Sequence, residues 1–472
     1  MVINKLLISF FIFIIIIVFL VIFFVNKFIN EFKYHTINTL NNFINKKNII
    51  NKKEYIKYVS NNIKFYRQYK YDDLKNFPII YKQDIRNNQN DFLNKNVKLL
   101  LNSKETVQNN WAEKKENNVY NYSFYRMYEF ITKVWYDNYA ICQITGGSSK
   151  QYFYQWYSKE ELILASYGFT RCFYNLGWRE NDKILLYYAH GANSVKILNY
   201  LNNFLYFYNV QSLYPKITNN DIDINHVFEF INTLNSFKPK IIVAFPSNIF
   251  RIAQLLLINN IKLDHVPDCM DLSAEYLYTC QYKFIKTIFK KCDIRLSYGT
   301  VEFGQIAQQT KEDNTVYEVF DEIVDIDNNE KNQLVITSYI LKTQPLIKYC
   351  IDDYGEVFKR NGKTYIKNLI GKQAKCVSDN EFNVIKINDI INKINKKELI
   401  IIDIKVKYIS KEIIIVMLKN IDIKMKRDIE DIFRNSLGYY SYNFNFIFKF
   451  CGNKKCVNIS NYNSKIIPVF CE

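Results

Sequence analysis

A stretch rich in glycine and hydroxyl groups, "ITGGSSK" at residues 144–150, is the first place where residue types suggest chemistry. It follows a short apolar run, "AICQI", which predicts a strand. Glycines let backbone amides approach an anion, and the hydroxyls and the lysine add donors, so the stretch suits a phosphate-binding loop. It lacks the Gly-Lys-Ser/Thr ending of the common nucleotide-binding loop, so a polar turn is the alternative.

Two later turns carry side chains that suit a nucleotide. In "LSYGTVEFG" (296–304), Tyr298 and Gly299 end a predicted strand and Glu302 follows, which suits a stacking ring and a Mg²⁺-binding carboxylate. In "QPLIKYCIDDYGEV" (344–357), Asp352 and Asp353 precede a tight turn and could accept hydrogen bonds from ribose hydroxyls. Taken alone, an ordinary strand turn and an Asx turn are the better explanations of these stretches.

The elements that must position these turns alternate between strands and helices. Short apolar runs rich in β-branched residues predict strands at 182–189, 239–247, 293–302 and 332–340. Helical patterns lie at 159–176, 193–207 and 248–260. This alternation predicts an α/β fold with a buried, partly parallel sheet.

Beyond Gly371, two strands at 398–410 and 412–419 and a helix ending near Gly438 predict a small α+β unit. The alternation in the first strand places Asp403, Lys405 and Lys407 on an exposed face.

The composition restricts the class of protein. With 472 residues, 49% of them hydrophobic, the chain is long enough for two or three domains. Its net charge of +17 comes from lysines spread along the whole chain, so we expect no nucleic-acid partner. Ten cysteines without a Cys-x-x-Cys pair predict reduced, mostly buried thiols.

Residues 6–25, "LLISFFIFIIIIVFLVIFFV", form a 20-residue apolar run with one serine as its only polar member. At a rise of 1.5 Å per residue such a helix spans the roughly 30 Å hydrocarbon layer. The run is too long for the core of a cleaved signal peptide and lacks a small-residue exit. We expect a single-pass membrane anchor at 1–26, a helical stalk at 27–60 and, from the lysines that follow the span, a cytosolic body.

The order and spacing of these stretches resemble the adenylate-forming superfamily, in particular its phenylacetate-CoA ligase and CapK-like (coenzyme F390 synthetase-like) branch. The resemblance covers about residues 60–470. It rests on the loop at 145–149, on the Tyr-Gly-x-x-Glu turn and on "PLIKYCIDD", which resembles the family's Pro-Leu-Ile-Arg-Tyr-Arg-Thr-Gly-Asp. Three quieter segments also resemble the branch, namely "FYR…FPIIYKQDI" (65–85), "KPKIIVAFPS" and "DLSAEYL" (271–277).

The resemblance implies a large, multi-layer adenylate-forming domain at 61–370 and a small, mobile C-terminal α+β domain at 371–472. It also implies ATP and Mg²⁺ as cofactors, a small-molecule carboxylate as substrate, and CoA, another thiol or an amine as acceptor. The nucleotide-binding residues that it implies are Thr145, Gly146, Gly147, Ser148, Ser149, Lys150, Ser273, Ala274, Glu275, Tyr298, Gly299, Thr300, Asp353 and Lys372.

Further roles follow from the same resemblance. Glu302 would hold Mg²⁺ and act with Lys465, which falls where the small domain's catalytic lysine is expected. Lys372, after Gly371, would lie at the hinge between the domains. His190 and Gly191 follow a predicted strand and are candidates for the substrate pocket, with a structural turn as the alternative.

Several positions depart from the family pattern. Lys150 replaces a loop glycine, Ala274 replaces the glycine of the adenine-binding segment, and Cys350 and Asp352 replace an arginine and a glycine. A non-glycine residue that must take positive φ is strained by about 1 kcal/mol or more. Three hypotheses therefore stand: a membrane-anchored ligase, a catalytically degenerate ligand-binding relative, and a basic surface-binding protein that uses the scaffold as structure.

Overall fold

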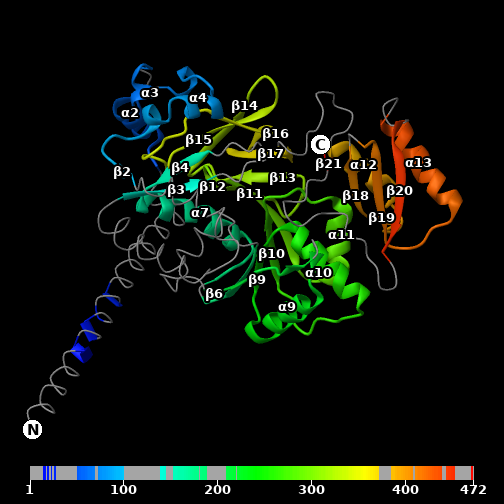
Figure 1. Ribbon diagram of the computed structural model, residues 1–472. Coiled ribbons are helices and arrows are strands. Elements are labelled where there is room, and N and C mark those ends of the chain that lie inside the picture. The colour runs from blue at the N-terminus through cyan, green and yellow to red at the C-terminus, as the bar shows by residue number, and fades with distance from the viewer. Residues whose placement is uncertain are drawn as a thin grey trace, which may run out of the picture.

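The computed structural model describes residues 50–69, 73–99, 139–144, 153–179, 181–188, 209–218, 221–371, 384–407, 410–437, 443–451 and 469–470, with a few helical positions before residue 28. Within these ranges one twelve-stranded sheet dominates the fold, with the strand order β14-β15-β16-β17-β13-β12-β11-β10-β9-β5-β6 and β1 beside β16. Figure 1 shows this sheet in the middle of the molecule. The predicted α/β class is confirmed.

One half of the sheet is parallel, and its inner strands β9 and β10 are fully buried. It consists of β11 (Asp293–Thr300), β10 (Cys269–Ser273), β9 (Ile241–Ala244), β5 (Lys183–Tyr187) and β6 (Asn209–Leu213). The four residues of β9 are at most 1% exposed. Apolar runs of this kind are typical of parallel strands that helices cover on both sides. Three of these strands, β5, β9 and β11, overlap predicted ones, whereas β10 and β6 lie in segments for which no strand was predicted.

The other half of the sheet is mostly antiparallel. It contains β12 (Gly304–Gln309), β13 (Val316–Val319), β14 (Val324–Asn328), β15 (Gln333–Ser338), β16 (Tyr349–Arg360) and β17 (Lys363–Ile370). The short β1 (Ile80–Tyr81) runs parallel to β16. Small sheets flank the large one, formed by β2 (Lys98–Leu99), β3 (Tyr139–Ile144) and β4 (Tyr154–Tyr157), and by β7 (Ile217–Thr218) with β8 (Asp221–Ile222).

The long helices of this part are α7 (Lys159–Asn175), α9 (Ile224–Phe237), α10 (Pro246–Ile258) and α11 (Thr279–Ile288). A capping box starts α7: Ser158 Oγ accepts a hydrogen bond from Glu161 N, and Glu161 Oε2 accepts one from Ser158 N. Gly168 lets α7 approach β12 closely, because a Cβ at this position would lie 1.9 Å from Gln305 O. This contact places α7 directly over the strand that follows Glu302.

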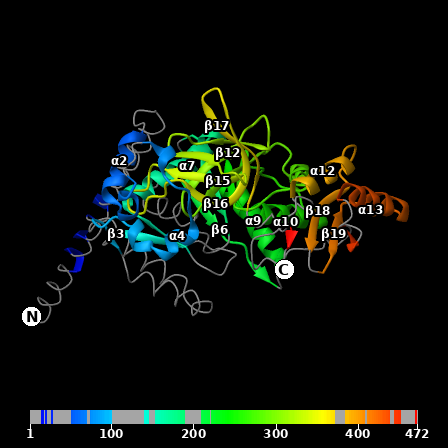
Figure 2. The same cartoon turned by 90° about the horizontal axis from the view of Figure 1, so that it is seen from above.

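Part of the predicted stalk is built into the body of the protein. Residues 52–62 form α2, whose Tyr55, Ile56 and Val59 are at most 4% exposed and join the main hydrophobic core. Short helices follow at α3 (Lys64–Arg67) and α4 (Lys82–Asn87). Figure 2 shows α2 and α4 at the end of the molecule opposite to α13. The packed part of the chain thus begins before residue 61, whereas the sequence interpretation placed its start at residue 61.

The C-terminal unit, residues 384–470, has its own four-stranded sheet. Its order is β20-β19-β18-β21, from β18 (Ile401–Lys407), β19 (Glu412–Met417), β20 (Asn445–Phe450) and β21 (Val469–Phe470). Its helices are α12 (Val384–Ile394) and α13 (Ile423–Leu437). These elements include the two predicted strands and the predicted helix. The proposed domain boundary at residue 370 stays a prediction.

The cysteine prediction holds only in part. Six described cysteines are free, and five of them are buried: Cys172, Cys269, Cys280, Cys292 and Cys350, with Cys142 half-buried. Cys451 is disulfide-bonded, which the expectation of reduced thiols did not foresee.

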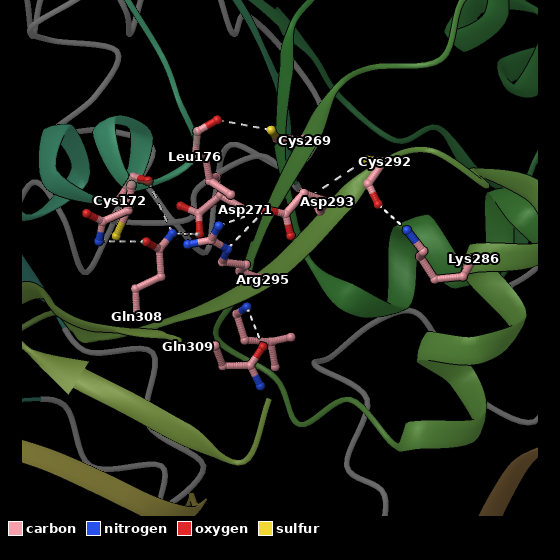
Figure 3. Close-up of polar contacts among 12 residues, drawn as sticks. Cys172, Leu176, Cys269, Asp271, Lys286, Cys292, Asp293, Arg295, Gln308 and Gln309 are labelled. Carbon is pink, nitrogen blue, oxygen red and sulfur yellow. Dashed lines mark hydrogen bonds and ion pairs between the residues drawn. The ribbon is translucent and has the colours of Figure 1, made fainter. Parts of the chain in front are cut away.

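Asp271 places a carboxyl group in the middle of the large sheet. It is 0% exposed, and it accepts a hydrogen bond of 3.4 Å from Gln308 Nε2. Figure 3 shows Asp271 facing Gln308 near Cys172, while the neighbouring Arg295 donates to Asp293 at 2.8 Å. Within the part of the chain that the structure describes, Asp271 Oδ2 has no hydrogen-bond partner. Burial raises the pKa of Asp271 to about 7.

We predict that Asp271→Asn stabilises the protein above neutral pH. An unfolded aspartate ionises near pH 4, whereas the folded one keeps its proton up to about pH 7. Folding of the wild type therefore weakens as pH rises through this window and stays weakened above it. The amide cannot ionise, so the variant should be more stable by roughly 2–4 kcal/mol at pH 8 and little changed near pH 4.

The measurement is urea unfolding followed by tryptophan fluorescence at pH 5 and pH 8. The exposed Asp268 provides the matched control Asp268→Asn, which should leave the pH dependence of the wild type unchanged. An Asp271→Asn variant that is less stable than the wild type at pH 8 would contradict the assignment of an ionised, poorly solvated carboxylate.

Candidate nucleotide site

The parallel strands β5, β9, β10 and β11 all end at the same edge of the sheet, because their neighbours run in the same direction. Ligands of open α/β sheets bind at this carboxyl edge. Three groups of predicted site residues lie here, or join this edge through their side chains: Ser273–Glu275 at the end of β10, Tyr298–Glu302 at the end of β11, and Asp353. The tight turn predicted after Asp353 is wrong, because Asp353 lies within the continuous strand β16. The edge is therefore the candidate site.

The turn after β10 is held from both sides. Ser273 and Tyr188, which follows β5, share a hydrogen bond of 2.8 Å between their hydroxyls. Glu275 Oε2 accepts a hydrogen bond of 3.0 Å from Ser247 N in the first turn of α10. A carboxylate at a helix N-terminus is favourable because unpaired N–H groups and the positive end of the helix dipole meet it. The exposed Ala274 between them takes φ +71°.

A hydrogen bond joins two of the predicted nucleotide-binding residues. Tyr298 Oη donates to Asp353 Oδ2 at 2.8 Å, although the two residues come from strands that are not neighbours in the sheet. Tyr298 is 9% exposed, and burial together with the negative charge of Asp353 raises its pKa well above its usual range. Tyr298 therefore stays a neutral donor and holds the Asp353 carboxylate in one orientation.

Glu302 is the buried carboxyl of the site, at 5% exposure. It lies in the turn between β11 and β12, which contains a register shift at Gly299. A Cβ at Gly299 would lie 2.5 Å from Gly304 O, so the tight turn requires glycine there. Tyr157 Oη donates to Val301 O at 2.6 Å and fixes the turn from β4. Thr300 Oγ1 is buried without a hydrogen-bond partner among the described residues.

The electrostatics of Glu302 favour a bound cation. Burial raises the pKa of Glu302, the positive charge of Lys82 lowers it, and the negative charge of Asp353 raises it. A cation beside Glu302 would offset both the cost of burying its negative charge and the repulsion from Asp353. In the described ranges no group of three His, Cys, Asp or Glu side chains lies together as a metal cage. One carboxylate instead fits a Mg²⁺ ion that takes its other ligands from phosphates and water.

Lys82 is a site residue that the sequence interpretation missed. It is the first residue of α4, and the pairing of β1 with β16 (Tyr81 opposite Cys350) carries it to the site. Its Nζ lies 5.6 Å from the centre of the Phe153 ring, and its charge acts on Glu302. The signal was present, because Lys82 stands in the "FPIIYKQDI" segment, but one lysine in a lysine-rich chain does not stand out.

Several predicted site residues lie outside the described residues. These are the whole loop Thr145, Gly146, Gly147, Ser148, Ser149 and Lys150, the pair His190 and Gly191, and the two lysines Lys372 and Lys465. The described residues Tyr139–Ile144 and Tyr154–Tyr157 form β3 and β4 on either side of the loop, so the predicted strand before it is confirmed. The roles of these residues stay predictions.

Comparison with known proteins gives a consistent result. No protein-family model matches the chain. The chain is 26% identical to Protein CapK of Staphylococcus aureus over 164 residues, which span 33% of this chain and 36% of CapK. It thus matches only about a third of that relative's length.

Solved structures extend the likeness over most of the chain. A structure of 2-hydroxyisobutyryl-CoA ligase in the postadenylation state, in complex with 2-HIB-AMP, has a TM-score of 0.54 at 12% identity and covers 89% of this chain and 88% of that chain. The same enzyme with R3-HIB-AMP has a TM-score of 0.55 at 11% identity, with the same coverage. At this identity the likeness shows the fold. The chain thus has the fold of the adenylate-forming ligases, and its resemblance to the CapK-like branch of that superfamily is confirmed.

Proposed function

We propose that this protein is an adenylate-forming ligase that activates a carboxylate with ATP and passes the acyl group to CoA or another acceptor. The observation that carries the proposal is the convergence of Tyr298, Glu302 and Asp353 at the carboxyl edge of the sheet, in the fold of such ligases. In the reaction, a substrate carboxylate oxygen attacks the α-phosphorus of ATP, and pyrophosphate leaves with the electron pair of the broken bond. The acceptor thiol or amine then attacks the acyl carbon, loses its proton, and releases AMP.

The described residues would bind and orient the nucleotide. The Asp353 carboxylate, held by Tyr298, would accept hydrogen bonds from the ribose hydroxyls. The backbone of Ser273–Glu275, fixed to Tyr188 and α10, would lie against the adenine. Orientation of this kind supplies a large part of catalysis when the bond-making step needs little covalent help from the protein.

Charge control would fall to Glu302 and Lys82. A Mg²⁺ ion held by Glu302 would supply neutralisation of phosphate charge when bound. Lys82, close to both Glu302 and the start of β4, would add positive charge on the phosphate side. From the resemblance, Thr145, Ser148, Ser149 and Lys150 would hold the β- and γ-phosphates, Lys465 would stabilise the α-phosphate, and Lys372 would lie at the hinge.

A degenerate relative is the second candidate function, and the backbone at two departures bears on it. Ala274 and Asp352 stand where the family has glycine, and both take left-handed backbone conformations, with φ of +71° and +65°. Both positions therefore keep the conformation that glycine would take, and the substituted residues carry the strain. Cys350 is 2% exposed and packs into the sheet. The retained backbone conformation at both positions favours the ligase over the degenerate relative.

We predict carboxylate-dependent exchange of labelled pyrophosphate into ATP. Asp353→Asn should lower the exchange rate about tenfold to a thousandfold, because the amide no longer accepts two hydrogen bonds with full negative charge. Glu302→Gln should raise the Mg²⁺ concentration needed for half-maximal exchange, and Lys465→Ala should abolish exchange while ATP still binds.

The exposed Glu330, in the turn before β15, provides the control Glu330→Gln, which should exchange like the wild type. The proposal fails if no carboxylate supports exchange and ATP does not bind. ATP binding without exchange in the wild type would identify the degenerate relative instead.

We predict that Ala274→Gly stabilises the protein. Glycine adopts positive φ without a Cβ clash, and this relief exceeds the extra flexibility of glycine in the unfolded chain. The gain should be about 0.5–1 kcal/mol in the free energy of unfolding, measured by urea denaturation. Ala274→Ser keeps the Cβ and should show no gain; a loss of stability in Ala274→Gly would show that the turn is not strained.

We also propose that residues 6–25 anchor the protein in a membrane, with its body on the cytosolic side. The described positions of this run, Ile14–Ile16, Phe19, Leu20 and Phe23, are helical, and their apolar side chains are 41–72% exposed. Among the described residues no helix is long and apolar enough to cross a bilayer. The proposal therefore rests on the sequence and on the exposure of these side chains.

We predict that the full chain stays in the membrane fraction after extraction with alkaline carbonate. The double variant Ile15→Arg with Phe19→Arg should release it, because each arginine at the centre of a span costs about 2.5–3.5 kcal/mol. The apolar control Ile15→Leu with Phe19→Leu should remain membrane-bound. Release of the wild type by carbonate would contradict the anchor.

A further inference from the structure

The N-terminal turn of α11 meets the C-terminal unit through polar side chains. Thr279 N donates to Asn388 Oδ1 at 2.9 Å, and Asn388 Nδ2 donates back to Thr279 Oγ1 at 3.1 Å. Two residues further, Gln281 Nε2 donates to Asp403 Oδ1 at 2.8 Å. Figure 1 shows α11 beside α12 and β18, which carry Asn388 and Asp403. Three hydrogen bonds thus connect the large sheet's helix to the smaller unit.

Asp403 is buried because α11 covers it. The alternation in the sequence predicts an exposed side chain here, yet Asp403 is 7% exposed. β18 shifts its register between Ile401 and Asp403, and the strand face around Asp403 packs against Tyr278 and Cys280 of the large unit. The prediction of an exposed face at Asp403 is therefore wrong. In an isolated C-terminal unit this face of β18 would meet water, but in the full chain α11 of the large unit covers it.

The surroundings of Asp403 satisfy an ionised carboxylate poorly. Its Oδ1 accepts from Gln281 Nε2 and, at 2.9 Å, from Ile404 N. Across α11 it faces the neutral Tyr278 and Cys280, and on its own strand the charge of Lys405 acts on it. Lys283 of α11 acts on Cys280. Burial raises the pKa of Asp403 to about 7, against the Gln281 hydrogen bond, the Ile404 N–H and Lys405.

We propose that Asp403 is a proton-controlled latch between α11 and the C-terminal unit. With its proton, the carboxyl group is neutral and is accommodated in the contact. Without it, the charge gains more from water than from one amide and one backbone N–H, so the contact opens more often. The protonated form of Asp403 therefore favours the docked arrangement, and the ionised form favours release.

The direction of the pH effect follows from linkage. A released, solvated Asp403 has an ordinary pKa near 4, whereas the docked one has a pKa of about 7. Docking therefore takes up a proton, and its equilibrium constant falls as pH rises between these values and is level above them. From pH 5.5 to pH 8 the docking constant should fall by about thirtyfold.

Hydrogen exchange of the Thr279 amide measures the contact directly, because this N–H donates to Asn388 across it. The full chain would be compared at pH 5.5 and pH 8, with the rates corrected for the intrinsic pH dependence of exchange. We expect the protection of Thr279 to fall by about thirtyfold in the wild type. In Asp403→Asn, protection should be the same at both pH values, because the amide still accepts from Gln281 and Ile404 but cannot ionise.

Two further variants separate the latch from a general weakening. Asp428→Asn removes an exposed carboxylate of α13 and should keep the full pH dependence. Asn388→Ala should lower Thr279 protection at both pH values and keep the ratio between them. Protection of residues 304–309 in the central sheet confirms that each variant is folded. A pH ratio in Asp403→Asn equal to that of the wild type, or a wild type without pH dependence, would overturn the proposal.

Discussion

The arrangement of the site depends on the position of β11 in the sheet. β11 pairs with β10 in parallel on one side and with β12 in antiparallel fashion on the other. It is therefore the strand where a buried parallel half becomes a mostly antiparallel half. Its carboxyl end must both finish a parallel strand and reverse at once into β12. The turn that performs this reversal carries Tyr298, Gly299 and Glu302, and the antiparallel half brings Asp353 of β16 to the same place.

Four carboxyl groups are buried in the protein, and they differ in the hydrogen-bond donors and charges around them. Glu161 is 2% exposed and accepts hydrogen bonds from Ser158 N, Lys342 N and Thr343 N, which tie α7 to the chain before β16. Burial raises its pKa against these three hydrogen bonds. Asp271 and Asp403 have fewer donors, and burial raises the pKa of each to about 7. Glu302 has the nearby charge of Lys82. Burial raises the pKa of all four groups, and they differ in the hydrogen-bond donors and positive charges that oppose this effect.

The sequence predicted those features that short-range patterns encode. Apolar runs located β5, β9, β11 and β15, and helical periodicity located α7, α10 and α13. Motif order predicted which residues meet at the carboxyl edge, and the hydrogen bond between Tyr298 and Asp353 agrees with that order. Lys82 escaped prediction because its place depends on β1 pairing with β16, a contact between segments about 270 residues apart.

What the sequence determined by itself is the alternation of elements, the apolar run at 6–25, and the turn residues whose types suit a nucleotide. These depend on periodicity and on local backbone preferences, which a few consecutive residues settle. Only the tertiary structure decided that residues 52–60 join the core, that Ala274 and Asp352 hold left-handed backbone, and that α11 buries Asp403. Each of these depends on what covers a residue from elsewhere in the chain, and burial by a distant segment leaves no period in the sequence.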